Sequence, residues 1–457
     1  MDNTVKNHKL LLRAALFLVV LAIAVYHLQG IFAYDDLYTY EDRTVFETEK
    51  RGRLDGVYIG GSDVFSYWQP LFGWRDHGIA IENWCANSMR AVAVQYFIEE
   101  ARKRQPDALF ILNLNTFKAQ KTNGLAPENI HRAVDYWPLS LNAIRLIHAM
   151  CERSDITGLD RLEFYLPIIR FHSGWDQLDA YAFGTLDENY RTSFHGSSFM
   201  SGVKDISDHY AIYDKPKPVS DDMRSIFGDL LDYCGENNLK VLFVKVPQAL
   251  DANHQGYLLT LQQMAEERGY PCLDLFDQID ALGMDLRQQW LNDDHTNIHG
   301  SLTVSKAIGD YLVEHYGFED KRGLPAWADW DASADAYMEI VKKYTLPFER
   351  DHAKRIITDI PVLNEPEVSG QSLRLSWKYD DQADGFIICR RCNSGDDMDW
   401  YEVGEAGAQA REWLDDDLAR RKRYTYTVVP YVALEGETVY GAFDARGITA
   451  KTEENIG

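Results

Sequence analysis

The chain has 457 residues, of which 46% are hydrophobic and 12% aromatic, which excludes a disordered protein and allows two or three domains. Its 71 acidic and 47 basic residues give a formal net charge of −24. That charge argues against a nucleic-acid partner, because binding to phosphates needs clustered lysine and arginine. It also disfavours a polyanionic polymer as substrate unless a local basic patch is present.

Residues 10–34 are the one long apolar stretch, and they predict a transmembrane anchor. Basic residues precede the stretch and acidic residues follow it, so the positive-inside rule leaves residues 1–9 as a cytoplasmic tail and exports the rest. We expect residues 35–52 to form a juxtamembrane stalk. The alternative is a signal peptide cleaved after the Ala22-Ile23-Ala24 triplet.

Residues 53–331 alternate short apolar strands with amphipathic helices. This pattern predicts an α/β domain with a parallel sheet covered on both faces. The expected strands are 56–59, 108–114, 240–246 and 272–275, and the expected helices are 91–104, 138–152, 220–238, 258–269 and 301–316.

Polar side chains follow these strands at their carboxyl ends, where ligands bind in parallel sheets. Ser62 follows the first strand after a glycine pair, and Asn115 and Lys245 stand at the ends of later strands. The segment Asn292-Asp293-Asp294-His295 precedes the last helix on a polar loop. We therefore expect all of these to meet at one edge of the sheet.

A serine and a distant histidine in this setting predict nucleophilic catalysis, in which the histidine takes the serine proton and a carboxylate orients the histidine. Ser62 is the predicted nucleophile and His295 the predicted base. Asp293 is the first choice for the orienting carboxylate and Asp294 the second. A Ser-His dyad is the remaining alternative. The chemistry calls for no cofactor and no metal.

Several segments resemble the blocks of the SGNH/GDSL hydrolase superfamily, with the serine early and the Asp/His pair late. Gly60-Gly61-Ser62 is similar to the first block, and residues 83–88 (Asn-Trp-Cys-Ala-Asn-Ser) to the second. Asn115 lies near the third, and His295-x-Asn297-x-x-Gly300 matches the last. The resemblance implies a three-layer fold and an oxyanion hole built from the Ser62 amide with Asn87 or Asn115. The chain departs from the family at Asn292, where an aspartate usually stands.

Residues 165–175 and 243–247 are similar to a membrane-anchored bacterial branch of that superfamily, the D-alanyl-lipoteichoic acid and alginate O-acetylation proteins. This resemblance implies a cell-surface polysaccharide or cell-wall polymer as substrate and a membrane acyl-donor protein as partner. It implies a serine esterase or O-acyltransferase acting on small acyl groups, acetyl above all. A catalytically inactive surface protein that binds a glycan or a protein partner is the alternative.

The long segment from 120 to 215 carries many aromatic residues and few periodic elements, which is typical of the rim or lid of a site. Arg170 is a candidate to hold a carboxylate or phosphate, and Trp175 to stack on a sugar ring. His172 and His195 are further candidates, and Lys245 is expected to contact substrate. An ion pair within the fold for Arg170 and a local core position for Trp175 are the alternative.

Residues 332–356 are predicted to be a helical linker, and residues 357–457 an all-β sandwich of short alternating strands. Leu373, Leu375 and Trp377 share one face of a strand. Trp377 and Tyr424-x-Tyr426-x-Val428 resemble the buried tryptophan and penultimate strand of fibronectin type III domains. Cys389 and Cys392 point to opposite faces of one strand, so we expect free thiols there.

Overall fold

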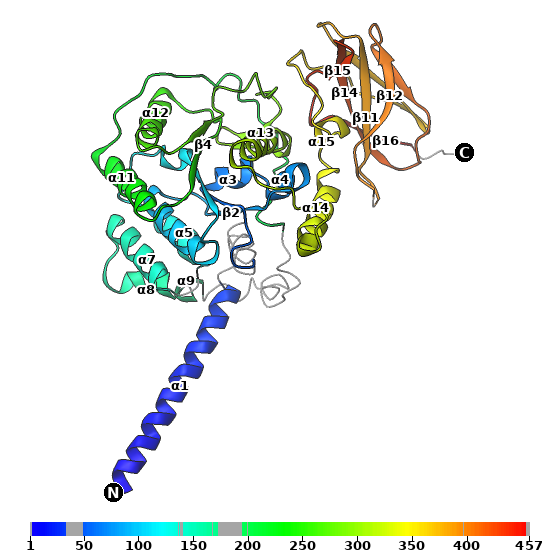
Figure 1. Ribbon diagram of the computed structural model, residues 1–457. Coiled ribbons are helices and arrows are strands. Elements are labelled where there is room, and N and C mark those ends of the chain that lie inside the picture. Colours follow the sequence, from blue (N-terminus) through cyan, green and yellow to red (C-terminus); the bar gives the residue numbers. More distant parts are fainter. Residues whose placement is uncertain are drawn as a thin grey trace.

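The computed structural model describes residues 2–32, 49–135, 137, 140–166, 168–171, 194–198, 200–395 and 397–453. Figure 1 shows three parts in chain order: a single long helix, an α/β domain and a β-sandwich. The candidates His172 and Trp175 lie outside the described residues.

The first part is helix α1 (Asp2–Phe32), which extends away from the α/β domain. Its window from His8 to Val25 has a mean hydropathy of 2.1, and none of that window is buried. The helix is long and apolar enough to cross a membrane, although a signal sequence near the N-terminus has the same properties. The structure thus confirms that the apolar stretch predicted from the sequence forms one helix of sufficient length to span a bilayer.

The α/β domain is built on a parallel sheet of five strands in the order β2-β1-β3-β4-β5. The strands are β1 (Gly56–Gly60), β2 (Ile81–Cys85), β3 (Leu109–Asn113), β4 (Val241–Lys245) and β5 (Cys272–Asp274). Because β2 and β3 lie on opposite sides of β1, the chain reverses direction across the sheet at β1. Ligands bind at such a switch point, at the carboxyl ends of the strands.

Successive residues of the strands face opposite sides of the sheet, which produces three layers. Val57 and Ile59 pack with helices on one face, whereas Tyr58 packs with helices on the other. The first face carries α5 (Ala91–Arg104), α11 (Asp221–Glu236) and α12 (Ala252–Glu266), and the second carries α3 (Ser62–Tyr67) and α13 (Ile298–Tyr316). The predicted parallel α/β architecture is confirmed.

The sequence patterns missed several elements. Strand β2 was not among the expected strands, since its polar Glu82 and Asn83 break the apolar run, yet the whole strand is buried. Helices α3 and α4 (Pro70–His77) follow β1 directly. Helix α7 (Leu141–Arg153) agrees with the helix expected at 138–152. The rest of the long segment after β3 contains further short helices that were not expected: η1 (Leu114–Phe117), α6 (Pro127–Val134), η2 (Gly158–Arg161), α8 (Leu162–Tyr165) and α9 (Ile168–Phe171).

The C-terminal part is an antiparallel sandwich of two sheets. One sheet has the order β13-β10-β8, with β9 also on β10, and the other has the order β12-β11-β14-β15, with β16 also on β14. The strands are β8 (Val362–Leu363), β9 (Glu367–Ser369), β10 (Ser372–Lys378), β11 (Gly385–Cys392), β12 (Tyr401–Gly407), β13 (Glu412–Asp415), β14 (Arg423–Leu434), β15 (Glu437–Tyr440) and β16 (Ile448–Lys451). Leu373, Leu375 and Trp377 are buried between the sheets as predicted. Cys389 and Cys392 are both free thiols.

The linker between the two domains packs on both of them. Helix α14 (Ala328–Val341) contributes Trp330, Tyr337 and Val341 to the core of the α/β domain. Helix α15 (Pro347–Arg350) instead places Phe348 against Tyr440 and Phe443 of the sandwich. The sandwich also reaches the α/β domain directly, because the Ala445 N–H donates to Gln288 Oε1 at 3.0 Å.

Candidate active site

Ser62 stands at the sharp junction where strand β1 passes into helix α3. Gly60 makes this junction possible, since a Cβ there would lie 2.7 Å from Val64 Cγ2 and 2.8 Å from Asn113 Cβ. The Ser62 side chain is half-buried, and its Oγ lies 2.7 Å from His295 Nε2. Two side chains 233 positions apart in the chain are therefore in direct hydrogen-bond contact, as the strand-end pattern predicted.

His295 is carried by a small hairpin of strands β6 (Trp290–Asn292) and β7 (His295–Thr296). Asn292 Oδ1 accepts hydrogen bonds from the backbone N–H groups of Asp294 (2.9 Å) and His295 (3.0 Å). The same oxygen lies 2.9 Å from His295 Nδ1. Asn292 thus occupies the place behind the histidine that a catalytic carboxylate would take.

The two backbone donors fix the orientation of the Asn292 amide. If the amide were turned over, its NH2 group would face two N–H groups, and donor would meet donor. Oδ1 therefore faces His295, so Nδ1 must carry the proton that it donates to this oxygen. Nε2 is then unprotonated and can accept the hydroxyl proton of Ser62. A neutral amide sets the tautomer here, but it stabilises a protonated imidazole less than a carboxylate would.

The expectation that Asp293 or Asp294 lies behind His295 is wrong. Asp293 pairs with Lys204 at 2.8 Å, and Asp294 pairs with Lys118 at 2.6 Å. Each carboxylate is therefore engaged by a lysine and not by the imidazole. Asn292, at the end of the preceding strand, holds that place.

The surroundings keep His295 neutral and place acidic groups nearby. Burial lowers the pKa of His295, more than the charges of Asp63 and Asp294 raise it. Burial also raises the pKa of Asp63, against the opposing effects of Lys118 and His295. Gln248 connects these groups, because its Nε2 donates to Asp63 Oδ2 (3.3 Å) and to the carbonyl of Asp294 (2.9 Å). A base with a lowered pKa remains ready to accept a proton at neutral pH.

The two asparagines expected near the oxyanion hole differ in position. Asn115 is fully buried, and its amide is engaged with the backbone of Val246, donating to the carbonyl at 2.9 Å and accepting from the N–H at 3.0 Å. Asn115 thus joins η1 to the end of β4. The structure gives it a role in holding the fold together, not the expected role of an oxyanion donor. Asn87 is half-buried just after β2, beside the β1 junction. The Ser62 N–H opens helix α3 and is the remaining candidate donor.

The expected substrate-binding residues are dispersed. Lys245 is buried, forms an ion pair with Asp274 and lies 3.2 Å from Gln262 Oε1. It lines a separate cavity of about 100 Å³, so its expected role at the Ser62 site is wrong. Arg170 lies on α9, 3.9 Å from Glu128. This contact agrees with an ion pair within the fold.

His195 belongs to a buried cluster with Glu49 and Glu82, the group of described side chains whose ligand atoms come close enough to suit a metal ion. Its Nδ1 lies 2.8 Å from Glu82 Oε1, and its ring stacks on Trp330. Glu49 already accepts from Arg53 and from the Trp330 indole. Within this cluster, Glu82 Oε2 is a buried carboxylate oxygen without a hydrogen-bond partner among the described residues, and burial raises the pKa of Glu82. A single unpartnered oxygen is too few ligands for a metal ion. A proton on Glu82 would satisfy this oxygen instead.

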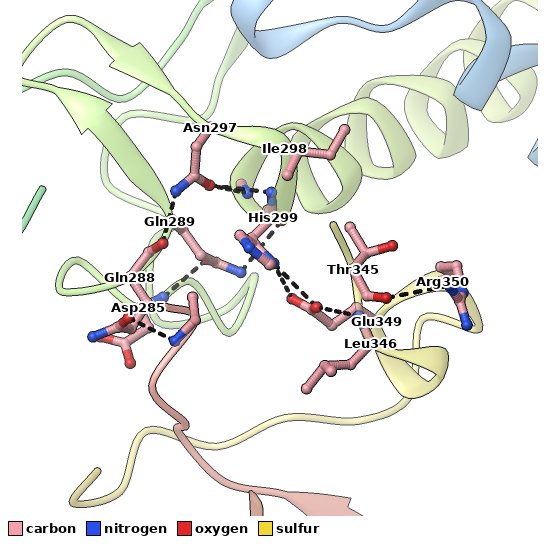
Figure 2. A network of polar contacts seen from close by, with 12 residues as sticks. Asp285, Gln288, Gln289, Asn297, Ile298, His299, Thr345, Leu346, Glu349 and Arg350 are labelled. Atoms are coloured by element: carbon pink, nitrogen blue, oxygen red, sulfur yellow. Dashed lines mark hydrogen bonds and ion pairs between the residues drawn. The ribbon is translucent and has the colours of Figure 1, made fainter. Parts of the chain in front are cut away.

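A second polar network lies behind the β6–β7 hairpin and joins the start of α13 to α15 (Figure 2). Asn297 caps α13 through its Oδ1 and donates to the Gln288 carbonyl at 2.8 Å. His299 Nδ1 then faces Glu349 of α15, at 2.9 Å from Oε1 and 3.0 Å from Oε2. Gly300 lets the helix approach closely, because a Cβ there would lie 2.4 Å from the Gln289 carbonyl oxygen. This network fixes the position of the start of α13 relative to the β6–β7 hairpin.

Sequence reasoning missed several residues of the site. Asp63 and Gln248 were not singled out, and neither was Lys118, although each contacts the His295 loop or its neighbours. Asp63 could have been found, because a carboxylate directly after Ser62 lies on the same helical turn. Gln248 carried no signal, since its contact depends on how the loop after β4 turns.

No protein-family model matches the chain, and no curated protein is significantly similar to it. Solved structures match over about a fifth of the chain. A fibronectin type III domain of human collagen XX is 25% identical over 22% of this chain and 98% of its own, with a TM-score of 0.18. A β-1,2-glucanase from Parabacteroides distasonis is 18% identical over 21% of this chain and 13% of its own, with a TM-score of 0.17. These matches indicate only that the C-terminal sandwich is similar to fibronectin type III domains in the arrangement of its strands.

Proposed function

We propose that the chain is a membrane-anchored serine esterase or O-acyltransferase of the SGNH type. The observation that carries the proposal is the 2.7 Å contact of Ser62 Oγ with His295 Nε2, backed by Asn292 on the far side of the ring. The parallel sheet with Ser62 at its switch point supports the same assignment. The substrate class is a small acyl ester, acetyl above all, on a cell-surface polysaccharide or cell-wall polymer.

In the proposed reaction Ser62 Oγ attacks the acyl carbonyl carbon, and His295 Nε2 takes the hydroxyl proton. The developing oxyanion is stabilised by the Ser62 N–H and a donor from the Asn87 region. When the tetrahedral intermediate collapses, the ester C–O bond breaks, and His295 returns the proton to the leaving alkoxide. Water or an acceptor hydroxyl then attacks the acyl-serine by the same steps in reverse.

The proposed location is the outer side of a membrane, with α1 as the anchor and residues 1–9 inside the cell. In the transferase version a membrane acyl-donor protein supplies the acyl group, and the polymer supplies the accepting hydroxyl. Hydrolysis and transfer share the acyl-serine, so the acceptor alone separates them.

The test is covalent labelling of the full chain with a fluorophosphonate probe. We expect one adduct on the peptide containing Ser62, none in Ser62→Ala, and undiminished labelling in Ser66→Ala, a buried serine on the same helix. Release of acetate from a chromogenic acetyl ester should follow the same order. Labelling of Ser62→Ala at the level of the parent protein would refute the assignment of the nucleophile.

The second candidate function is a catalytically inactive surface protein that binds a glycan or a protein partner. The neutral Asn292 behind His295 favours it, since the family places a carboxylate there. In that case neither the probe nor the ester would react with the folded protein, while glycan binding would survive Ser62→Ala.

A further inference from the structure

A row of exposed leucines lies on the short helices that follow α7. Leu159 on η2 is 80% exposed, Leu162 on α8 is 43% exposed, and Leu166 after α8 is 39% exposed. We call these three residues the apolar ledge. Phe164 points the other way and is buried in the domain core, so the turn has an inner and an outer apolar side. An inner side accounts for folding, but leucines on the outer side need another contact.

The ledge lies at the end of α1. Helix α9 directly follows the ledge and packs beside α1, and Figure 1 shows α8 and α9 where α1 meets the domain. The apolar window of α1 ends at Val25 and the helix at Phe32, which adds seven residues, or about 10 Å at 1.5 Å per residue. The polar interfacial layer on each side of a bilayer is about 5–8 Å thick. The end of α1, with α9 against it, thus lies at the outer edge of the lipid headgroup layer.

We propose that the apolar ledge rests in the outer leaflet of the bilayer that α1 crosses. The continuity of the ledge with α1 favours lipid over a second protein, because any chain anchored by α1 brings these leucines to the membrane surface. Exposed leucine side chains on short helices suit the interfacial layer of a bilayer. The inference rests on the proposed anchoring by α1 but not on the proposed esterase chemistry.

The consequence is a fixed tilt of the α/β domain. A contact of the ledge with lipid, beside the packing of α9 on α1, sets the orientation of the domain as well as its distance from the membrane. The domain would then present one face to the lipid surface and hold the Ser62 site at a constant height above it. Such a geometry suits the transfer of an acyl group between a membrane partner and a polymer close to the membrane.

The test uses the full chain in phosphatidylcholine vesicles, with an environment-sensitive NBD fluorophore on single introduced cysteines. Leu159→Cys reports on the ledge, Leu18→Cys on the apolar window of α1, and Leu434→Cys on a half-exposed sandwich position. The unsubstituted protein, labelled in parallel, gives the background from Cys272 and Cys392. Spin-labelled lipids with the nitroxide at a shallow position serve as quenchers.

We expect blue-shifted emission and at least twofold quenching at positions 18 and 159, with neither at 434. Quenching at 18 without quenching at 159 would overturn the ledge alone and leave the anchor standing. A blue shift at 159 that lipids do not quench would mean that protein covers the ledge, and this too would overturn the inference. Lack of quenching at both 18 and 159 would overturn the anchor and the ledge together.

Discussion

Two histidines four positions apart, His295 on strand β7 and His299 in the first turn of helix α13, have partners of opposite kind. His295 faces the neutral amide of Asn292 and keeps its other nitrogen on Ser62. His299 faces the carboxylate of Glu349 and is buried away from the site (Figure 2). The chain therefore places full charge behind the histidine that joins two parts of the fold, and a dipole behind the histidine proposed as the base. A carboxylate partner stabilises a protonated imidazole more than a neutral amide does.

The largest expected effect comes from removing the imidazole at the site. His295→Gln should lower the turnover of a small acetyl ester by about 10³-fold or more, since the general base is lost while binding remains. Its melting temperature should stay within a few degrees of the parent protein, because the side chain is half-buried and its partner is neutral. Thermal unfolding and ester hydrolysis measured on the same sample separate the two effects. If His295→Gln kept a tenth or more of the parent activity, His295 would not be the general base.

Replacing His299 should mainly lower the stability of the protein, whereas replacing His295 should mainly lower its activity. His299→Leu leaves the buried Glu349 with the Leu346 N–H but without its side-chain hydrogen-bond partner, and removing one partner of such a pair costs about 3 kcal/mol or more of folding free energy. His254→Leu, on an exposed face of α12, is the matched control. Chemical denaturation of the three proteins at neutral pH gives the comparison. Equal stability of His299→Leu and the control would show that the pair contributes nothing.

The pH dependence of that difference has a definite sign. Burial alone would raise the pKa of Glu349, but His299 and Arg355 outweigh it and hold the pKa below its usual value. A depressed carboxyl pKa contributes stability above the unfolded value, near 4.3, and this contribution is lost as the pH falls through the folded value. The stability gap between the parent protein and His299→Leu should therefore narrow below about pH 4.

These contrasts also show what the sequence could predict. Strand-end placement brought Ser62 and His295 together correctly, because parallel strands align their carboxyl ends whatever the details of the loops. The partner of His295 was mispredicted, because chemistry alone called for a carboxylate and two aspartates were adjacent. Which of three neighbouring side chains turns inward depends on the hairpin register between Trp290 and Thr296. The prediction that Asn115 donates to the oxyanion was wrong for the same reason, since a position at a strand end does not fix the direction of a side chain.

A smaller effect is expected from giving the site the partner that it lacks. Asn292→Asp would place a carboxylate behind His295 and raise the pKa of its imidazole, by about one unit for a partly buried pair. The base works when neutral, so the acid limb of kcat/KM should move to higher pH by the same amount. Asn253→Asp adds the same charge on α12 away from the hairpin and should leave the limb in place. An unmoved limb in Asn292→Asp would mean that position 292 does not act on His295.

The smallest effects are expected at the two aspartates of the hairpin loop. Asp293→Asn removes a half-exposed pair with Lys204, and pairs of this kind contribute at most about 1 kcal/mol. Asp294→Asn also removes a partner of Lys118, and with it a negative charge that raises the pKa of His295. Turnover near pH 6 should therefore change more in Asp294→Asn than in Asp293→Asn, with both changes within about threefold and the acid limb of Asp294→Asn moved slightly to lower pH. Parallel pH profiles of the two variants measure this order. A larger loss in Asp293→Asn would indicate that the hairpin rearranges during turnover to bring Asp293 behind the histidine.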